Sequence, residues 1–523
     1  MNEIFITDAS AIFTEKLTQD DTIIKGDKFY FGKITQDFEP IENPKYDLRC
    51  NRILKHLVDK LDLSGLKKEE IGIVIGTTNS GIQEFEETEN KHHAELGNPA
   101  EFLKWYLDTK NYAACVSTAC TSGVKAFSTA QKLLQNRVCK AVIAGGIDTL
   151  ASMPSYGFHA LEVLSHEKTN PFSKNRNGIN LGEGGALFVL KPAEHVEKET
   201  DNSSQISILG IGETSDAYHS ATPDPDGIQA VRAIQLALDN ANLKPDDIDY
   251  INLHGTGTIS NDLMEANAIY KVFENKVPAS STKPLTGHCL GVAASIEAFI
   301  CYQILKGERN LPIHKFDGEY DETLPKINLV NNETPQKEIE ICMSTSFGFG
   351  GTNAVMILGK TNFKNIKNID ADAASCLPHS EPMVLIDRVL DVDMANQIVK
   401  TSVTIHENKI FFDKEINGIS PLVGIEFMAQ TIGCYAFYKA GKTVPKIGFL
   451  LGARLYENSL EKFENGKTYI ITAREIYGDN ELVSFECLIY NENEDGNSEN
   501  HVAKATINAF QPKDVEKYIK ELK

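Results

Sequence analysis

Residues Val116–Phe127 read VSTACTSGVKAF, and here a cysteine stands at the start of an apolar, helix-like segment. Small and hydroxyl-bearing residues surround Cys120, and Gly123 removes bulk just after it, so that an acyl group could approach the backbone. The N–H groups at a helix N-terminus favour negative charge, and we therefore expect a lowered pKa for this thiol. The alternative is a structural role, because a single buried cysteine is more often a small hydrophobic residue than a nucleophile.

Around this segment, short apolar stretches alternate with helix-like stretches over residues 1–360. Buried strands are predicted at Ile71–Thr77, Ala141–Asp148 and Ala186–Lys191, and helices at Gly123–Asn136 and Gly227–Leu243. In the last of these, Ile228, Ile234 and Leu238 roughly follow one helical stripe. Such alternation indicates α/β layers with a mostly parallel sheet. The pattern restarts near Ile206, which predicts two similar halves, about 1–205 and 206–360.

The character of the sequence changes after Asn353–Lys360. Residues 361–375 are polar and are the best candidate for a linker. Residues 376–512 then contain one helix-like apolar segment, Leu422–Gly441, followed by stretches of alternating polarity such as Leu482–Tyr490. One helix with antiparallel strands predicts an α+β domain, and residues 513–523 are expected to form a short exposed helical tail.

Charge and cysteine usage exclude several functional classes. The 523 residues carry a formal net charge of −21, whereas nucleic-acid or membrane-surface binding needs a basic face. The N-terminus lacks the positive region of a secretory signal, and we expect no membrane span. The ten cysteines form no Cys-x-x-Cys pair and no Cys/His metal spacing, so we expect no metal site, reduced thiols and a cytoplasmic location.

Three further segments contain residue types suited to catalysis. His254 precedes a Gly-Thr-Gly-Thr turn, Lys283 is followed by His288 and then Glu297, and Phe349 lies among glycines. A single histidine or glycine-rich loop is weak evidence for a site. Three such segments in one chain with a candidate thiol favour a catalytic interpretation.

Together these segments resemble the β-ketoacyl-[acyl-carrier-protein] synthase family of condensing enzymes. The resemblance covers roughly residues 1–360 and follows the family's order. The matching motifs are TAC-x-SG at Cys120, AGGID, PFSKNRNG, LGEGGA, HGTGT…ND at His254, STK…TGH…G at Lys283, and SFGFGGTNA at Phe349. The resemblance implies a thiolase-like α/β fold with two similar halves in five αβαβα layers.

The resemblance also implies roles for the reacting groups. Cys120 would accept the acyl chain as a thioester. His254 and His288 would bind the malonyl thioester carbonyl and stabilise the enolate formed as CO2 leaves. Lys283, paired with Glu297, would support the histidines electrostatically rather than act as a nucleophile.

The remaining implied roles concern substrate entry. The backbone N–H groups of Cys120 and Phe349 would form the oxyanion hole, and the Phe349 ring would gate the acyl pocket. Thr256 and Thr258 would contact the pantetheine arm of the carrier. The chain itself would bind no cofactor, because the substrates are carried on the 4′-phosphopantetheine of acyl carrier protein.

The sequence departs from the synthase pattern in two places. The opening is IFITDASAIF, and Ser173 and Asn177 replace two aspartates of the usual PFDxxRDG motif. These changes remove no catalytic group but leave the subfamily and substrate open. Residues 96–120 resemble condensing enzymes of aryl polyene and flexirubin-type pigment clusters.

Residues 376–512 resemble hotdog-fold 3-hydroxyacyl-[acyl-carrier-protein] dehydratases of the same pigment type. The matching segments are LPHSEPMVLIDRVL at Leu377–Leu390 and GIEFMAQTIG at Gly424–Gly433. Glu426 is a candidate acid, because burial raises the pKa of a carboxyl group. Its alternative role is to stabilise the helix N-terminus as an anionic residue.

The histidine of this second site is ambiguous. The usual GHFP motif before the glutamate is replaced by FFDKEING. His379 is therefore the preferred base, and His406 is the other candidate. If neither reaches Glu426, the domain is a dimerisation or acyl-binding module.

These observations predict a bifunctional, carrier-protein-dependent homodimer that condenses and then dehydrates acyl chains. A separate ketoreductase must act between the two steps, because neither domain has a GxGxxG motif after a strand. A non-catalytic chain-length-determining partner is the alternative from another class, but such proteins typically lack the active cysteine. Thiolases resemble this site but use a second cysteine.

Overall fold

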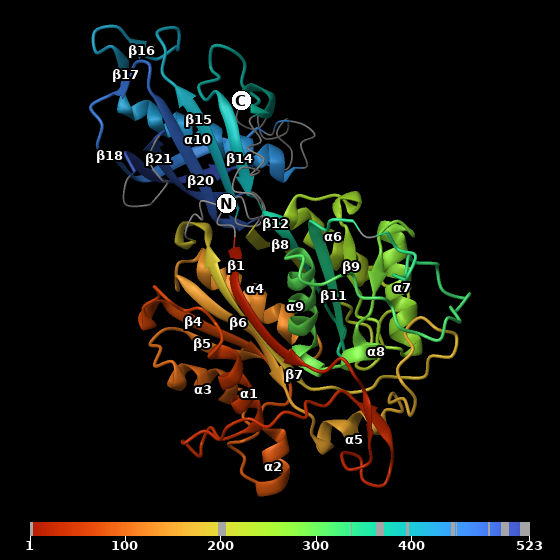
Figure 1. Cartoon of the computed structure of the whole chain (residues 1–523). Coiled ribbons are helices and arrows are strands. Elements are labelled where there is room, and N and C mark those ends of the chain that lie inside the picture. Colours follow the sequence, from red (N-terminus) through yellow and green to blue (C-terminus); the bar gives the residue numbers. More distant parts are fainter. Residues whose placement is uncertain are drawn as a thin grey trace. The chain divides into compact units, whose positions relative to one another are not determined.

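The strands expected at Ile71–Thr77, Ala141–Asp148 and Ala186–Lys191 are all present in the computed structural model of the chain. The structure describes residues 4–196, 205–335, 337–361, 371–393, 397–440, 445, 447–479, 482–492 and 501–512. The chain divides near residue 362 into an N-terminal unit and a C-terminal unit, which are described separately below (Figure 1). Most of the expected linker (362–370) and the whole expected tail (513–523) lie outside the described residues.

The N-terminal unit is built on one ten-stranded sheet. Its strands are β1 Ile4–Phe13, β4 Ile71–Gly76, β5 Ala113–Val116, β6 Ala141–Asp148, β7 Gly184–Pro192, β8 Gln205–Ser215, β9 Tyr250–Asn252, β10 Ala279–Ser280, β11 Ile341–Gly348 and β12 Thr352–Thr361, and β2 Thr18–Asp20 pairs with β3 Phe29–Phe31 beside it. The strand order is β10-β9-β11-β12-β8-β1-β7-β6-β4-β5. From the central β1–β8 pair outward, one half runs β1-β7-β6-β4-β5 and the other runs β8-β12-β11-β9-β10. When the strands of each half are numbered along the chain, both halves have the order first, fifth, fourth, second, third.

The sheet is mixed, so the prediction of a mostly parallel sheet was wrong. β4 pairs in parallel with β5 and β6, and β9 with β10 and β11, but the pairs around β1, β7, β8 and β12 are antiparallel. The β11–β12 pair is a hairpin whose turn is the glycine-rich segment Phe349–Gly351. Gly350 and Gly351 have φ of +86° and +75°, a conformation that favours glycine. A hairpin needs no crossover helix, which is why strand–helix alternation alone misses it.

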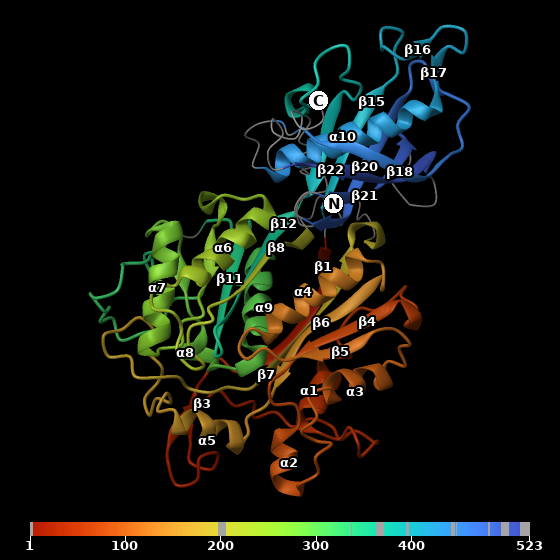
Figure 2. The same ribbon diagram turned by 180° about the vertical axis from the view of Figure 1, so that it is seen from behind.

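Helices cover both faces of each half-sheet. The helices of this unit are α1 Arg49–Val58, α2 Ile82–Thr88, α3 Asn98–Tyr106, α4 Ser122–Gln135, α5 Ser152–Ala160, α6 Ile228–Ala241, α7 Ile259–Phe273, α8 Lys283–Thr286 and α9 Ala293–Leu305. α1 and α3 pack on the outside of one half and α6 and α7 on the outside of the other, with α4 and α9 between the halves (Figures 1 and 2). Three apolar clusters fill these interfaces.

The burial of α6 differs from the sequence expectation in detail. The buried stripe of α6 runs through Ala230, Ile234 and Leu238, whereas Ile228 at its start is 59% exposed. α9 is buried on nearly all sides, which explains its uniformly apolar sequence. A Cβ at Gly123 would lie 2.6 Å from Ser295 Oγ of α9, so this glycine makes room for the helix crossing rather than for an acyl group.

No helix among the described residues is long and apolar enough to cross a bilayer.

The C-terminal unit has a seven-stranded antiparallel sheet and one long helix. The strands are β13 Ala371–Asp372, β14 Arg388–Asp393, β15 Ile398–Thr404, β18 Phe449–Asn458, β20 Thr468–Asp479, β21 Leu482–Asn491 and β22 Ala503–Phe510, and a small second sheet comprises β16 Phe412–Asp413, β17 Gly418–Ile419 and β19 Phe463–Glu464. The helix expected at Leu422–Gly441 is α10, Gly424–Lys439, and it packs against the large sheet. β13 starts at Ala371, five residues before the expected domain boundary.

Candidate active sites

The backbone around Cys120 forms a sharp turn between β5 and α4. Ala119 has φ of 54°, a left-handed conformation that is uncommon for a residue with a side chain. Hydroxyl groups hold the turn: Ser122 Oγ donates to Ala119 O (2.6 Å) and accepts from Thr118 N (2.9 Å), and Thr121 Oγ1 donates to Thr118 O (2.7 Å). The small and hydroxyl-bearing residues of VSTACTSG therefore place the thiol just before the helix.

The fold brings Cys120 together with both predicted histidines. His254 follows β9 and His288 follows α8, and one nitrogen of each lies within 4.8 Å of the other and of Cys120 Sγ. The three side chains are buried, with exposures of 7%, 1% and 3%. The imidazole planes are nearly perpendicular, at 89°. Three groups from three distant segments thus meet in one enclosed pocket.

The hydrogen bonds of the histidines define their tautomers. His288 Nδ1 accepts the backbone N–H of Leu290 at 3.0 Å. His254 Nδ1 lies 3.2 Å from Lys283 Nζ, and an ammonium group can only donate. Burial and the Lys283 charge also hold the pKa of both imidazoles well below the usual value. Both histidines are therefore neutral and carry their proton on Nε2, so each offers one N–H donor.

Lys283 is the charged centre of this site. It is 1% exposed, and its Nζ lies 2.6 Å from Glu297 Oε1 and also donates to His254 O. Burial raises the pKa of Glu297, while the neighbouring ammonium opposes that rise.

The spacing of the thiol and the two imidazoles would also suit a metal ion. The buried ammonium beside His254 disfavours a second cation there, and an acyl-transfer site fits the same groups better.

The expected low pKa of Cys120 was wrong. Burial raises the pKa of this thiol to about 11, although Lys283 and the backbone N–H groups of Phe349 and Cys120 lower it. Position before a helix therefore does not compensate for the loss of solvation on burial. The same two N–H groups lie beside the sulfur.

Phe349, in the β11–β12 turn, is one of the residues that line the pocket. Its ring stacks on Phe158 of α5 with centroids 5.6 Å apart and planes 29° apart. Both rings line the pocket beside Cys120 and are half-buried. Phe158 was not identified from the sequence, because only the tertiary structure brings α5 against the glycine-rich hairpin.

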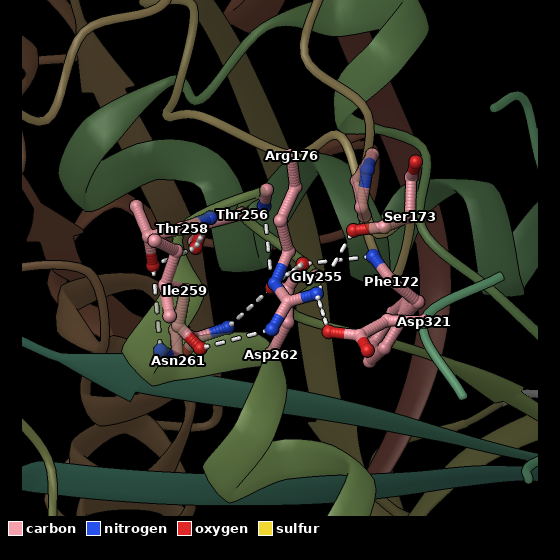
Figure 3. Close-up of polar contacts among 12 residues, drawn as sticks. Phe172, Ser173, Arg176, Gly255, Thr256, Thr258, Ile259, Asn261, Asp262 and Asp321 are labelled. Carbon is pink, nitrogen blue, oxygen red and sulfur yellow. Dashed lines mark hydrogen bonds and ion pairs between the residues drawn. The ribbon is translucent and has the colours of Figure 1, made fainter. Parts of the chain in front are cut away.

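The turn after His254 lies along the pocket, and a buried ion network contacts it (Figure 3). Thr256 and Thr258 line the pocket, and their hydroxyl oxygens are 3.0 Å apart. Thr258 also caps α7 by accepting from Asn261 N. Thr258 therefore has a structural role in addition to the contact with the pantetheine arm that we expect.

Arg176 and Asp262 are the centre of that network. Asp262 is fully buried, accepts the N–H groups of Phe172 (2.8 Å) and Gly257 (3.2 Å), and has a pKa raised by burial to about 6. Arg176 lies 4.0 Å from Asp262 and 2.5 Å from Asp321 (Figure 3). The ion network ties PFSKNRNG to HGTGT and so fixes the turn that carries His254.

The two departures in PFSKNRNG are accommodated by hydrogen bonds. Ser173 Oγ donates to Asp317 at 3.0 Å, and Asn177 Oδ1 accepts from Ser165 Oγ at 2.5 Å. Among the residues that the structure describes, neither Ser173 nor Asn177 lines the pocket. Arg176 lies between them in the sequence, belongs to the ion network beside the turn, and matches the family motif.

The reactivity of Cys120 should reflect its raised pKa. With a pKa of about 11, a fraction of about 10⁻⁴ of the thiol is ionised at pH 7, so alkylation by iodoacetamide should accelerate about tenfold per pH unit between pH 7 and 10. Lys283→Met should slow alkylation further at each pH, because the ammonium lowers this pKa. Peptide mass spectrometry measures both rates, with Lys125→Met on α4 as the control. A plateau near pH 7 would contradict this assignment.

Loss of Arg176 should destabilise the unit. Arg176→Met removes the cation between two carboxylates, and we expect a decrease of about 3 kcal/mol in the free energy of unfolding at pH 8. The decrease should become smaller below pH 6, where Asp262 takes up a proton in the folded state and needs no counter-ion. Urea unfolding measures it. Lys174→Met, which removes an exposed ion pair with Glu319, should have a far smaller effect, and equal losses would refute the argument.

The C-terminal unit has its own cavity, along α10. Glu426, in the first turn of α10, and His379 both line it. Gln430 Nε2 donates to Glu426 Oε1 at 3.0 Å and to Met383 O at 2.8 Å, so it orients the carboxylate. His379 and His406 are both exposed, but His406 is not among the described residues that line this cavity. The structure thus places His379, rather than His406, in the same cavity as Glu426.

Known proteins are similar to both units of the chain. Residues 9–195 and 206–317 match the N-terminal and C-terminal domain models of beta-ketoacyl synthase, and residues 371–520 match the ApeP dehydratase model. The chain is 32% identical to 3-oxoacyl-[acyl-carrier-protein] synthase 2 of Synechocystis sp. over 327 residues, which are 58% of this chain and 77% of the relative. The enzyme of the same name from Staphylococcus aureus is also 32% identical, over 58% of this chain and 78% of its own length.

A solved structure is similar over the N-terminal unit. It is the ketosynthase ApeO in complex with its chain length factor ApeC from Xenorhabdus doucetiae, with a TM-score of 0.64 and 32% identity over 69% of this chain and 98% of that chain. The thiolase-like fold and both resemblances inferred from the sequence are therefore confirmed. The chain belongs to the β-ketoacyl-[acyl-carrier-protein] synthase family and carries an ApeP-like dehydratase domain after its synthase domain.

Proposed function

We propose that the chain is a bifunctional, carrier-protein-dependent enzyme that elongates an acyl chain and dehydrates the 3-hydroxyacyl product in fatty acid or polyene synthesis. The observation that carries the condensing activity is the meeting of Cys120 Sγ with two histidines that each offer an Nε2–H donor. The proposal includes a cytoplasmic homodimer and a separate ketoreductase that converts the 3-oxoacyl product into the 3-hydroxyacyl substrate.

The first half-reaction transfers the acyl group to the enzyme. Cys120 Sγ attacks the thioester carbonyl of an acyl chain carried on 4′-phosphopantetheine, and the thiol proton leaves with the pantetheine sulfur. The N–H groups of Cys120 and Phe349 stabilise the tetrahedral oxyanion.

The second half-reaction forms the carbon–carbon bond. The malonyl thioester oxygen accepts the Nε2–H groups of His254 and His288 as CO2 leaves and the electron pair of the broken bond becomes an enolate. The enolate carbon attacks the acyl-Cys120 carbonyl, and collapse of the tetrahedral intermediate expels the Cys120 sulfur and gives a 3-oxoacyl carrier thioester. Neutral donors suit this step, because they stabilise developing negative charge without protonating the carbon. Thr256 and Thr258 contact the pantetheine arm.

The condensing activity has a direct test. Wild type incubated with an acyl carrier should gain the acyl mass on Cys120 and release CO2 from malonyl carrier, and Cys120→Ala should gain no acyl mass. His254→Ala and His288→Ala should still be acylated but should lose at least about 10²-fold in CO2 release, because each removes one donor to the enolate. Intact-protein mass and CO2 release are measured. An unmodified Cys120 with no CO2 release would refute the synthase function.

We further infer that the C-terminal unit is a hotdog-fold dehydratase. His379 removes the C2 proton of the 3-hydroxyacyl thioester, and the carboxyl group of Glu426 donates a proton to the C3 hydroxyl, which leaves as water. Gln430 donates to one carboxyl oxygen of Glu426, so the other oxygen is the one that acts on the substrate. The support for this assignment is the shared cavity of His379 and Glu426 and the match to the ApeP dehydratase model.

The dehydratase assignment is tested with a 3-hydroxyacyl carrier. Glu426→Gln and His379→Ala should each reduce formation of the enoyl product by at least about 10²-fold, since each loses one partner of the proton transfers. His406→Ala is the matched control and should react at the wild-type rate. Equal dehydration by wild type and Glu426→Gln would remove Glu426 from the mechanism.

Two alternatives are less well supported. A non-catalytic partner resembling a chain length factor would not need the complete set of Cys120, His254, His288 and Lys283. A non-catalytic hotdog module for dimerisation or acyl binding would not need Gln430 to orient a carboxylate inside the cavity.

A further inference from the structure

Two cysteines of the C-terminal unit meet where a short 3-10 helix packs against α10. Cys376 ends this helix, η5 Ala373–Cys376, and Cys434 lies in α10. The two thiols are hydrogen-bonded to one another. The adjacent residues are close as well, because a Cβ at Gly433 would lie 2.9 Å from Leu377 Cδ2. Both cysteines belong to the apolar core of the unit, so the alternative is that they are only small hydrophobic residues.

The position of Cys376 differs from that of an ordinary core cysteine. Cys376 is buried, but Ser375 before it and Pro378 after it are exposed. Ser375 Oγ lies 3.6 Å from Cys376 Sγ. Pro378 and, next to Cys434, Gly433 line the dehydratase cavity described above. Both thiols thus lie close to positions that a small polar molecule can reach.

The hydrogen bonds at this place favour the thiolate form of one sulfur. Hydrogen bonds with Cys434, Ser375 and Tyr438 lower the pKa of Cys376 to about 6, although burial opposes this change. The contact with Cys376 raises the pKa of Cys434 in turn, and burial adds to that rise. The pair therefore combines a thiolate, which is the nucleophilic form of cysteine, with a thiol that keeps its proton.

A second pair of hydrogen-bonded cysteines, in the N-terminal unit, provides a comparison. Cys301 of α9 and Cys342 of β11 lie in an apolar core, and their sequence neighbours Ile300, Tyr302 and Met343 are buried too. Burial and the neighbouring thiol raise the pKa of Cys342 well above its usual value. This pair has the contact between thiols but neither the exposed neighbours nor the favoured thiolate.

We propose that Cys376 and Cys434 form a site of reversible oxidation, at which hydrogen peroxide converts the two thiols into a disulfide that slows the dehydratase. The effect on dehydration rests on the dehydratase function proposed above.

The oxidation proceeds in two steps. The Cys376 thiolate attacks one peroxide oxygen and the O–O bond breaks, which gives a sulfenic acid, and the other oxygen takes up the proton released by the thiol and leaves as water. The Cys434 sulfur then attacks the sulfenic sulfur, the S–S bond forms, the S–O bond breaks, and the hydroxyl leaves with the Cys434 proton as a second water. The two thiols lose two electrons in total, which reduce one peroxide to two waters. A dithiol reductant reverses the change by thiol–disulfide exchange.

The disulfide would join the two segments that carry the proposed dehydratase residues. His379 follows Cys376 by three residues, and Glu426 precedes Cys434 by eight residues, about 12 Å along α10. Disulfide sulfurs are only about 2.0 Å apart, much closer than two hydrogen-bonded thiols, so the segment around η5 has to move toward α10. A shift of about 1 Å in the segment that carries His379 is enough to slow proton transfer.

The oxidation site is tested in the full-length protein treated with hydrogen peroxide at pH 7. Peptide mass spectrometry without reduction should show a Cys376–Cys434 disulfide that dithiothreitol reverses, while Cys301 and Cys342 stay reduced. In Cys434→Ser the reaction should stop at a Cys376 sulfenic acid, which dimedone labels, and Cys376→Ser should give neither product. Cys487→Ser, which changes another buried cysteine of the same unit, is the matched control and should form the wild-type disulfide.

The effect on activity is measured as enoyl formation from a 3-hydroxyacyl carrier. Oxidised wild type should react at least about tenfold more slowly than reduced wild type and should recover with dithiothreitol, whereas peroxide should leave the rate of Cys376→Ser unchanged.

The possible failures are distinguishable. Absence of the Cys376–Cys434 disulfide, or equal disulfide formation by Cys301 and Cys342, would overturn the oxidation site. A disulfide that leaves the rate unchanged would overturn its effect on the dehydratase. Failure of reduced wild type to dehydrate the substrate would instead refute the dehydratase function, and the peptide masses would still decide the oxidation site.

Discussion

The synthase site depends on one buried positive charge. Lys283 is almost completely shielded from water, and an unpaired ammonium in that position would cost several kcal/mol. Glu297 compensates it at 2.6 Å, and Glu297 lies on α9, the helix enclosed between the two half-sheets. Burial and this charge together hold the pKa of both imidazoles well below the usual value, and the charge opposes the rise that burial causes in the pKa of Cys120. The Lys283 ammonium can only donate, so the proton of His254 is on Nε2. The protonation states of these three side chains thus depend on the packing of the two halves around α9.

Features set by local sequence could be predicted well. The strands at Ala141–Asp148 and Ile71–Gly76, α4 after Cys120 and α10 around Glu426 follow from apolar runs and periodicity in their own segments. The residues that we propose as catalytic could be identified because the synthase motifs keep their order along the chain. The direction of strand pairing was not predictable in this way, because it depends on where each connection returns in space. The β11–β12 hairpin, hidden in a glycine-rich motif, is the clearest example.

Features set by contacts between distant segments could not be predicted. The partner of Phe349 is Phe158, and the partner of Lys439 is Glu475, and neither pair shares a motif. The pKa of Cys120 had the wrong predicted direction for the same reason, since local sequence gives the helix start but not the degree of burial. Gly123 was assigned to substrate access although its neighbour is Ser295, 172 residues later.

Phe349 performs two tasks with one residue. Its ring stacks on Phe158 in the lining of the pocket, and its backbone N–H faces the sulfur of Cys120. In the proposed mechanism this N–H group stabilises the oxyanion, so a change in the β11–β12 turn that moves the ring also moves the donor. Under that mechanism the range of acyl chains admitted and the speed of their transfer are coupled traits, and a lineage that adapts to a bulkier chain through this turn has to restore the donor by compensating changes in the strands that hold it.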